Sequence, residues 1–145
     1  MLKISPSDYD AIRHHGEQTY PHECCGILIG TSEGDTRTVL RTVACRNVSV
    51  SPQTRYDIDP RELIPAQREA HAHGLDIVGF YHSHPDHPVQ WSPADLEQAH
   101  WIGCSYLITS VENGVAKETA SFVLRGTIEE DKKLVEEQLQ LGTRD

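Results

Sequence analysis

The sequence has no long hydrophobic run. Its 145 residues are 37% apolar and 24% charged. A membrane-spanning helix needs about 20 consecutive apolar residues, and no segment approaches that length. Residues 1–6 (MLKISP) lack the basic start, apolar stretch and small-residue cleavage site of a signal peptide. We therefore expect one globular domain over residues 1–145, located in the cytoplasm and without a membrane partner.

Basic residues are also few. The chain has 13 Lys and Arg against 22 Asp and Glu, a formal net charge of −9. Because phosphate binding depends on patches of Lys and Arg, this composition argues against nucleic acid as a partner. Part of the acidic excess lies in residues 129–137. We interpret this segment either as a solvated acidic face or as a docking surface for a basic partner.

Cysteine is scarce and not arranged for pairing. Cys24 and Cys25 are adjacent, whereas Cys45 and Cys104 are isolated. This is neither the spacing of a disulfide framework nor that of a CxxC zinc site. Cys24 or Cys25 beside a histidine would make a nucleophile. However, cysteines that lead into a buried strand are more typical of a hydrophobic core.

Three capping patterns predict helices. Ser-Pro-x-Asp and Asp-Pro-x-Glu are typical of a helix N-terminus with proline in the first position. They predict helices over residues 5–19, 59–74 and 92–100. Residues 128–141 also have a helical pattern, with Ile128, Val135 and Leu139 roughly on one face. We therefore expect a core of about residues 1–125 followed by a helical tail, residues 126–145.

Apolar or alternating runs predict the strands. These runs are residues 24–30, 36–44, 55–58, 76–83, 105–111 and 115–124. Asn113-Gly114 is a hairpin turn signal between the last two. Together with the helices they predict an α/β (α+β) domain, a central sheet with helices packed on it.

Two histidines end the predicted strand at 76–83. His82 and His84 are two residues apart, so on a strand their side chains point to the same side and can reach one metal ion. His71 and His73 have the same spacing but lie on a predicted helix. There, side chains two residues apart point about 200° apart and cannot chelate together. The first pair is therefore the predicted ligand pair.

Asp95 is the predicted third ligand. It also has a purely structural interpretation, because Ser92 and Asp95 form a helix-capping box by themselves. The two roles are compatible. A helix that starts just after a strand can point the carboxylate at its third position back toward the end of the strand. Two histidines and one carboxylate leave zinc an open fourth position, which is typical of a catalytic site. Water bound there would have its pKa lowered to about 7.

A general base and an oxyanion donor are needed beside such a metal. Glu23 precedes the strand predicted at 24–30 and is our candidate base, although taken alone it would be an exposed acid. Ser92 is the candidate oxyanion donor, although taken alone it is a helix cap. No H-E-x-x-H sequence is present, and the signature of zinc base deaminases is missing too.

These residues together resemble the JAMM (MPN+) metalloprotease family. The family pattern is an upstream Glu, then H-x-H, seven residues and S-x-x-D. Here it is Glu23, His82-Ser83-His84, residues 85–91 and Ser92-Pro93-Ala94-Asp95. Residues 21–26 (PHECCG) and 79–81 (GFY) are also similar to the family, and the likeness covers about residues 1–125. The resemblance implies a single JAMM/MPN domain with a cytidine-deaminase-like curved mixed sheet flanked by helices.

The resemblance also implies roles. His82, His84 and Asp95 would bind one Zn²⁺, Glu23 would activate the water, and Ser92 would steady the tetrahedral intermediate. A chain without room for insertions is similar to the compact prokaryotic branch. Some members of that branch act on small ubiquitin-fold sulfur carriers ending in Gly-Gly, and they release an amino acid such as cysteine or a short extension. The resemblance thus adds cysteine biosynthesis to the expected roles.

A Gly-Gly tail is slim enough to lie extended in a narrow zinc groove. His87, Gln90 and Trp91 follow the ligands and are candidates to line that groove, or else belong to an ordinary exposed loop. Two alternatives stay open. One is an isopeptidase on ubiquitin-like conjugates or a peptidase of other short peptides, and the other is a non-catalytic MPN scaffold. The oligomeric state is open as well, with the predicted helix at 128–141 as a possible homodimer contact.

Overall fold

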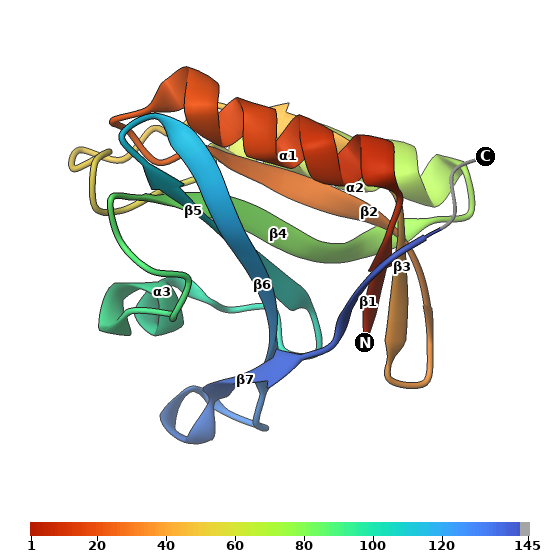
Figure 1. The fold of residues 1–145 in the computed structure, drawn as a ribbon. Coiled ribbons are helices and arrows are strands. Elements are labelled where there is room, and N and C mark those ends of the chain that lie inside the picture. Colours follow the sequence, from red (N-terminus) through yellow and green to blue (C-terminus); the bar gives the residue numbers. More distant parts are fainter. Residues whose placement is uncertain (143–145) are drawn as a thin grey trace.

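The computed structural model describes residues 1–142 and forms one mixed eight-stranded sheet (Figure 1). The strand order is β7-β6-β5-β4-β2-β3-β1-β8. The central strand β4 is antiparallel to β2 and parallel to β5. The strands are β1 (Leu2–Ile4), β2 (Cys25–Glu33), β3 (Thr36–Cys45), β4 (Asp76–Pro85), β5 (Ser105–Glu112), β6 (Val115–Arg125), β7 (Lys133–Glu137) and β8 (Leu139–Leu141).

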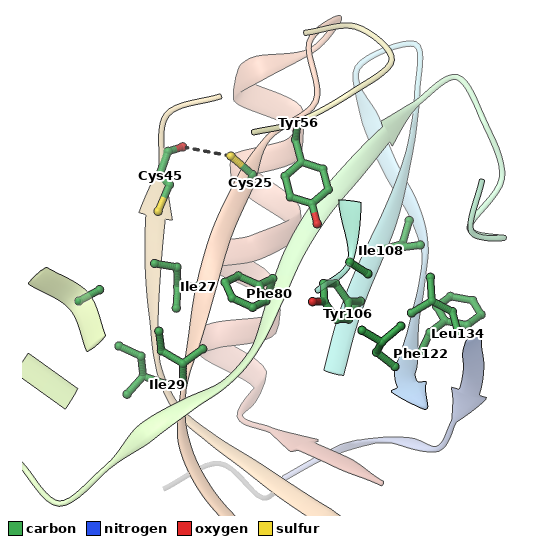
Figure 2. Packing of buried hydrophobic residues seen from close by; sticks show 14 of the residues in the cluster. Cys25, Ile27, Ile29, Cys45, Tyr56, Phe80, Tyr106, Ile108, Phe122 and Leu134 are labelled. Atoms are coloured by element: carbon green, nitrogen blue, oxygen red, sulfur yellow. Dashed lines mark hydrogen bonds between the residues drawn. The ribbon is translucent and has the colours of Figure 1, made fainter. Parts of the chain in front are cut away.

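Helices cover both faces of the sheet. Helix α1 (Pro6–Thr19) packs on one face, where Ile12 belongs to the same buried cluster as Leu28 and Tyr81. Helices α2 (Pro60–Ala72) and α3 (Pro93–Gln98) pack on the other face. Figure 2 shows the apolar side chains of this second face on the side of the sheet away from α1. None of the helices within residues 1–142 is both long and apolar enough to cross a membrane.

The three predicted helix starts are confirmed. The Ser5 hydroxyl accepts the backbone N–H of Asp8 at 3.1 Å, and the Asp59 carboxylate accepts that of Arg61 at 2.9 Å. Ser92 forms a complete capping box with Asp95. Each cap satisfies a backbone donor that would otherwise lack a partner in the first turn. The sequence therefore sets the helix starts locally.

Strand β4 contains an irregularity that sets which way its side chains point. Leu28 pairs with Gly79 but Ile29 pairs with Ile77, so Val78 is an extra residue in the ladder. Such a bulge shifts the alternation of side chains by one position. Ile77 and Phe80 consequently share the face of α2 and α3, and the histidines that follow Phe80 at intervals of two face the same side.

Gly79 lies beside this bulge and allows β4 to approach β5. A Cβ atom at this position would lie 2.2 Å from the carbonyl oxygen of Ser105, far inside contact distance. A larger residue would therefore push the strand that carries the histidines away from its neighbour.

The helix predicted at residues 128–141 is wrong. The chain there forms a short 3-10 helix, η1 (Glu129–Asp131), followed by β7 and β8, which pair with β6 and β1. Of the residues that suggested a helical face, Ile128 and Val135 are exposed. The helical tail and the helical homodimer contact are therefore both withdrawn.

Buried polar contacts explain why this segment is extended. The carboxylate of Glu137 accepts hydrogen bonds from Arg37 at 2.9 Å, Ser105 at 2.6 Å and Ser121 at 2.7 Å. Arg37 and Ser105 lie on β3 and β5, far from Glu137 in sequence. Leu134 is also buried in the core. Tertiary contacts thus override the weak helical periodicity.

The strand predicted at residues 55–58 is also wrong. Only an isolated bridge joins Asn47 to Ile58. The side chain of Asn47 makes the hydrogen bonds that a paired strand would otherwise make. Its amide nitrogen donates to the carbonyls of Glu23 and Arg55 at 3.1 and 2.9 Å. Its amide oxygen accepts the N–H of Asp57 at 3.1 Å. Backbone groups of Arg55 and Asp57, within residues 46–59, which we call the Asn47 loop, are therefore satisfied without strand pairing.

Candidate active site

The end of β4 brings two histidines together, as predicted. The Nε2 atoms of His82 and His84 lie 3.3 Å apart, and both side chains are buried. Cys25, at the start of β2, is the register partner of His82. The antiparallel pairing of β2 with β4 therefore brings Glu23, two residues before the start of β2, toward the histidines.

Asp95 lies opposite the two imidazoles. Its Oδ1 is 3.1 Å from Nε2 of His82, and its Oδ2 is 3.0 Å from Nε2 of His84. The Oδ2 atom also accepts the backbone N–H of Ser92 at 2.9 Å, so the capping box and the cluster share one carboxylate. One donor atom from each residue lies within 4.8 Å of the others. This donor set fits a metal ion such as zinc.

The alternative histidine pair does not join this cluster. His71 contacts Asp76 through Nε2 at 3.1 Å, whereas His73 contacts the backbone oxygen of Glu69 through Nδ1 at 3.0 Å. Both side chains are exposed. The distinction between the two H-x-H sequences is confirmed, and helix geometry is its physical cause.

Contacts behind the cluster orient the two imidazoles. His84 donates its Nδ1–H to the carbonyl oxygen of Pro88 at 2.7 Å, which leaves the Nε2 lone pair facing the cluster. His82 has no such partner at Nδ1 within residues 1–142. Instead its ring stacks on Tyr56, with centroids 4.4 Å apart. Packing therefore orients one imidazole and a hydrogen bond orients the other.

The cluster favours an ionised carboxylate at Asp95 and shifts the pKa values of the two imidazoles in opposite directions. Burial lowers the pKa of His82. Burial also acts against protonation of His84, but the hydrogen bond and charge of Asp95 outweigh it and raise that pKa. Burial opposes ionisation of Asp95, yet contacts with both histidines hold its pKa far below its ordinary value. An ionised carboxylate beside two imidazoles attracts a cation.

Glu23 lies beside the cluster with one oxygen unsatisfied. The residue is only 4% exposed, and its Oε1 has no hydrogen-bond partner within the described chain. Burial raises its pKa to about 8, which the positive charge of His84 opposes and the negative charge of Asp95 reinforces. A buried carboxylate oxygen without a partner is costly unless a water or ion binds it. This orphaned atom therefore fits a metal-associated water.

A groove opens in front of the cluster. Its volume is about 470 Å³. The predicted residues that line it are Glu23, His84, Ser92, His87, Gln90 and Trp91. All three groove candidates therefore line this cavity, although the indole of Trp91 remains partly exposed.

Sequence reasoning missed the contribution of the Asn47 loop. Thr54 and Arg55 also line the groove, and the next residue, Tyr56, stacks on His82. In Figure 1 this loop (yellow) lies at the same end of the molecule as the end of β4 and the start of α3. No local signal in residues 46–59 announces this position, because it depends on the side chain of Asn47.

The cysteines do not form a second centre. All four are free thiols, and Cys24, Cys25 and Cys45 are buried. Burial raises the pKa of Cys24 and of Cys45 to about 12 in each case. Cys25 packs in the core beside Cys45, as Figure 2 shows. Protonated, buried thiols are poor nucleophiles, which supports the core interpretation over a cysteine hydrolase.

The chain is similar to known proteins over most of its length. Residues 5–125 match a family model described as prokaryotic homologs of the JAB domain. A desampylase of Haloferax volcanii is 37% identical over 113 residues, covering 75% of this chain and 80% of that protein. A probable TtuB-protein conjugate cleaving protease of Thermus thermophilus is 36% identical over 101 residues, covering 70% and 65%.

A solved structure agrees with the fold. A protein from Desulfitobacterium hafniense has a TM-score of 0.84 and 30% identity, over 99% of this chain and 94% of that one. The extent of the family match and the identity with the Haloferax protein show the family. With its His-His-Asp cluster at the end of β4, the chain belongs to the prokaryotic JAB/MPN domain family and is a metalloprotease of the JAMM type.

Proposed function

We propose that the chain is a zinc-dependent hydrolase of the bond that follows the C-terminal Gly-Gly of a small ubiquitin-fold protein. The observation that carries the proposal is the meeting of His82, His84 and Asp95 beside the unpartnered carboxylate of Glu23. Zinc bound by this ligand set supplies a Lewis acid, which lowers the pKa of water to about 7 and polarises a carbonyl group.

Glu23 is assigned the proton transfers. Its Oε1 takes the proton from the attacking water and returns it to the nitrogen of the leaving amine. Burial alone favours the protonated acid, but a cation held by the neighbouring cluster favours the ionised base. Its backbone is held on both sides, since its N–H donates to Pro52 at 2.7 Å and its carbonyl accepts from Asn47 at 3.1 Å.

Ser92 is assigned the role of stabilising the negative charge that develops on the substrate's carbonyl oxygen. Its hydroxyl oxygen accepts the backbone N–H of Asp95 at 3.1 Å. A hydroxyl that accepts one hydrogen bond can still donate its own proton. One atom can therefore cap α3 and donate to an oxyanion in the groove.

The groove and the relatives support the Gly-Gly specificity. His87, Gln90 and Trp91 line the groove with Glu23, and a segment without side chains can lie extended among them. One relative is named for cleaving TtuB-protein conjugates, which favours a ubiquitin-like protein as the acyl part of the substrate. All four cysteines are free, which supports the cytoplasm as the location.

Two kinds of leaving group are compatible with this proposal. The first is an amino acid such as cysteine, or a short extension, joined to the Gly-Gly by a peptide bond. The second is the side-chain amine of a lysine in a conjugated protein, and the relatives' names favour this isopeptide. Both share the acyl part and the chemistry at Glu23.

The test uses one ubiquitin-fold carrier in two forms. One form ends in Gly-Gly-Cys, and the other is joined through its Gly-Gly to a lysine side chain. Mass spectrometry should show release of the carrier with a free Gly-Gly terminus from at least one form. Glu23→Gln and a chelator should each block it. No cleavage of either form by protein with stoichiometric zinc would overturn the proposal.

A further inference from the structure

We propose that Arg55 is a specificity-determining residue that binds the α-carboxylate of the residue leaving after Gly-Gly. The inference rests on the proposed function and deepens it. It makes the groove selective for a single leaving amino acid with a free α-carboxylate over a lysine isopeptide. The ligand of Arg55 is thus a carboxylate.

Arg55 is a permanently charged side chain among the residues that line the groove. It lines the same cavity as Glu23, His84 and Ser92, in a chain whose formal net charge is −9. Several other arginines already have carboxylate partners, namely Arg37 with Glu137, Arg41 with Glu69, Arg61 with Asp59 and Arg125 with Asp35. Arg55 has no ion-pair partner among residues 1–142, although it also lines a second hollow together with Glu97 and Glu129. Its guanidinium is therefore available to a ligand.

The backbone of Arg55 is tied to the catalytic residues. Its carbonyl accepts the Asn47 amide at 2.9 Å, and the same amide donates to the carbonyl of Glu23 at 3.1 Å. Its N–H donates to Ser51 at 3.0 Å. The next residue, Tyr56, is buried against His82. Arg55 therefore projects from a backbone held on both sides, rather than from a loose loop.

The chemistry of the leaving group places a carboxylate within reach. In an α-amino acid, the carboxylate carbon is two bonds from the nitrogen that leaves. Because that nitrogen must lie near Glu23 to receive its proton, the carboxylate must lie in the same groove. A lysine side-chain nitrogen is followed by four methylene groups, so an isopeptide presents apolar chain at this position.

The charges around the groove also favour Arg55 as the residue that binds the substrate carboxylate. A substrate carboxylate that enters the groove meets the carboxylate of Glu23 and the acidic surface of the chain, which repel it. The planar guanidinium of Arg55 compensates this charge and matches a carboxylate with two parallel hydrogen bonds. Removing the cation should thus penalise only substrates that carry the carboxylate.

The experiment compares three leaving groups on one carrier ending in Gly-Gly. They are alanine with a free carboxylate, alaninamide, and a lysine side chain in a peptide. We expect wild-type kcat/KM for the carboxylate to exceed that for the amide by roughly 10- to 100-fold. Arg55→Gln should remove this preference by slowing only the carboxylate substrate. Arg55→Lys should recover part of it.

Arg46→Gln is the matched control. Arg46 begins the same loop, is exposed and does not line the groove. Its replacement by Gln changes the net charge by the same amount as Arg55→Gln. It should leave the preference intact. Equal wild-type rates for carboxylate and amide, or an Arg55→Gln effect of equal size on both, would overturn the inference.

Binding separates this inference from the proposed function. Failure of all three substrates to react would contradict the proposed function. The dissociation constants of the carboxylate and amide substrates would then be measured with Glu23→Gln protein, with and without Arg55→Gln. Tighter binding of the carboxylate that depends on Arg55 would support the inference, and equal binding would overturn it.

Discussion

The ring of Tyr56 stacks on the imidazole of His82, with 4.4 Å between centroids and 22° between planes. His82 lacks a hydrogen-bond partner at Nδ1 within the described residues, so this packing holds the ring from behind while Asp95 contacts its Nε2 at 3.1 Å. A metal ligand is normally oriented by a hydrogen bond from behind. Here an aromatic residue from the Asn47 loop takes that role.

Tyr56→Ala should therefore weaken zinc binding. An aromatic pair contributes about 0.5–1.5 kcal/mol beyond buried area, so we expect affinity to fall by about 10-fold. Tyr56→Phe keeps the ring and should bind within about 2-fold of wild type. Zinc affinity by competition with a chromogenic chelator checks both variants. Equal loss in the two would assign the effect to the hydroxyl group instead.

The two H-x-H sequences give a matched metal test. His84→Ala should lose zinc, because it removes one of the three ligands, whereas His73→Ala should retain it. Binding to the folded state also stabilises it. Added zinc should thus raise the Tm of wild type and His73→Ala but not of His84→Ala. A zinc-dependent Tm in His84→Ala would remove that residue from the site.

Glu23→Gln separates metal binding from catalysis. The amide has the same shape but cannot accept the proton of the attacking water. We expect kcat to fall by about 10²- to 10⁴-fold with the zinc content unchanged. Elemental analysis and turnover of the same preparation check this. Full activity with bound zinc would show that another residue is the base.

Glu137→Gln tests the contacts that hold the C-terminal strands. Glu137 and Arg37 form a buried pair at 2.9 Å, with side chains 6% and 5% exposed. Breaking such a pair leaves an uncompensated charge, so we expect a loss of about 3 kcal/mol in the free energy of unfolding. Urea denaturation measures it. Glu136→Gln, on the exposed neighbour, should change stability by less than about 0.5 kcal/mol.

The same pair should make stability depend on acid pH. Burial acts to raise the pKa of Glu137, but hydrogen bonds from Ser105, Ser121 and Arg37 outweigh it and leave the pKa below its ordinary value of 4.5. Its stabilisation is therefore present above pH 4.5 and is lost as the pH falls through the lowered folded-state pKa. The gap in unfolding free energy between wild type and Glu137→Gln should shrink below pH 4.5. A constant gap from pH 7 to pH 3 would contradict this.

Local patterns predicted the helix starts correctly, and they also identified the residues that meet in the His82-His84-Asp95 cluster. Ser5, Asp59 and Ser92 cap helices because their side chains reach a backbone N–H two or three residues on, a contact that needs no other part of the chain. The failures lie at residues 55–58 and 128–141. In both, side-chain contacts to distant backbone or buried charge outweighed a weak local pattern.

The sequence by itself determined the three residues of the predicted metal cluster. His82 and His84 face one side because a strand alternates, and Asp95 returns because a capping box follows at a short distance. Only the tertiary structure decided what surrounds them. The bulge at Val78 selects the face on which the histidines lie, and the Asn47 amide brings the Asn47 loop to the groove beside Glu23. Strand register and a single amide's hydrogen bonds join parts of the chain far apart in sequence, so no local pattern could carry that information.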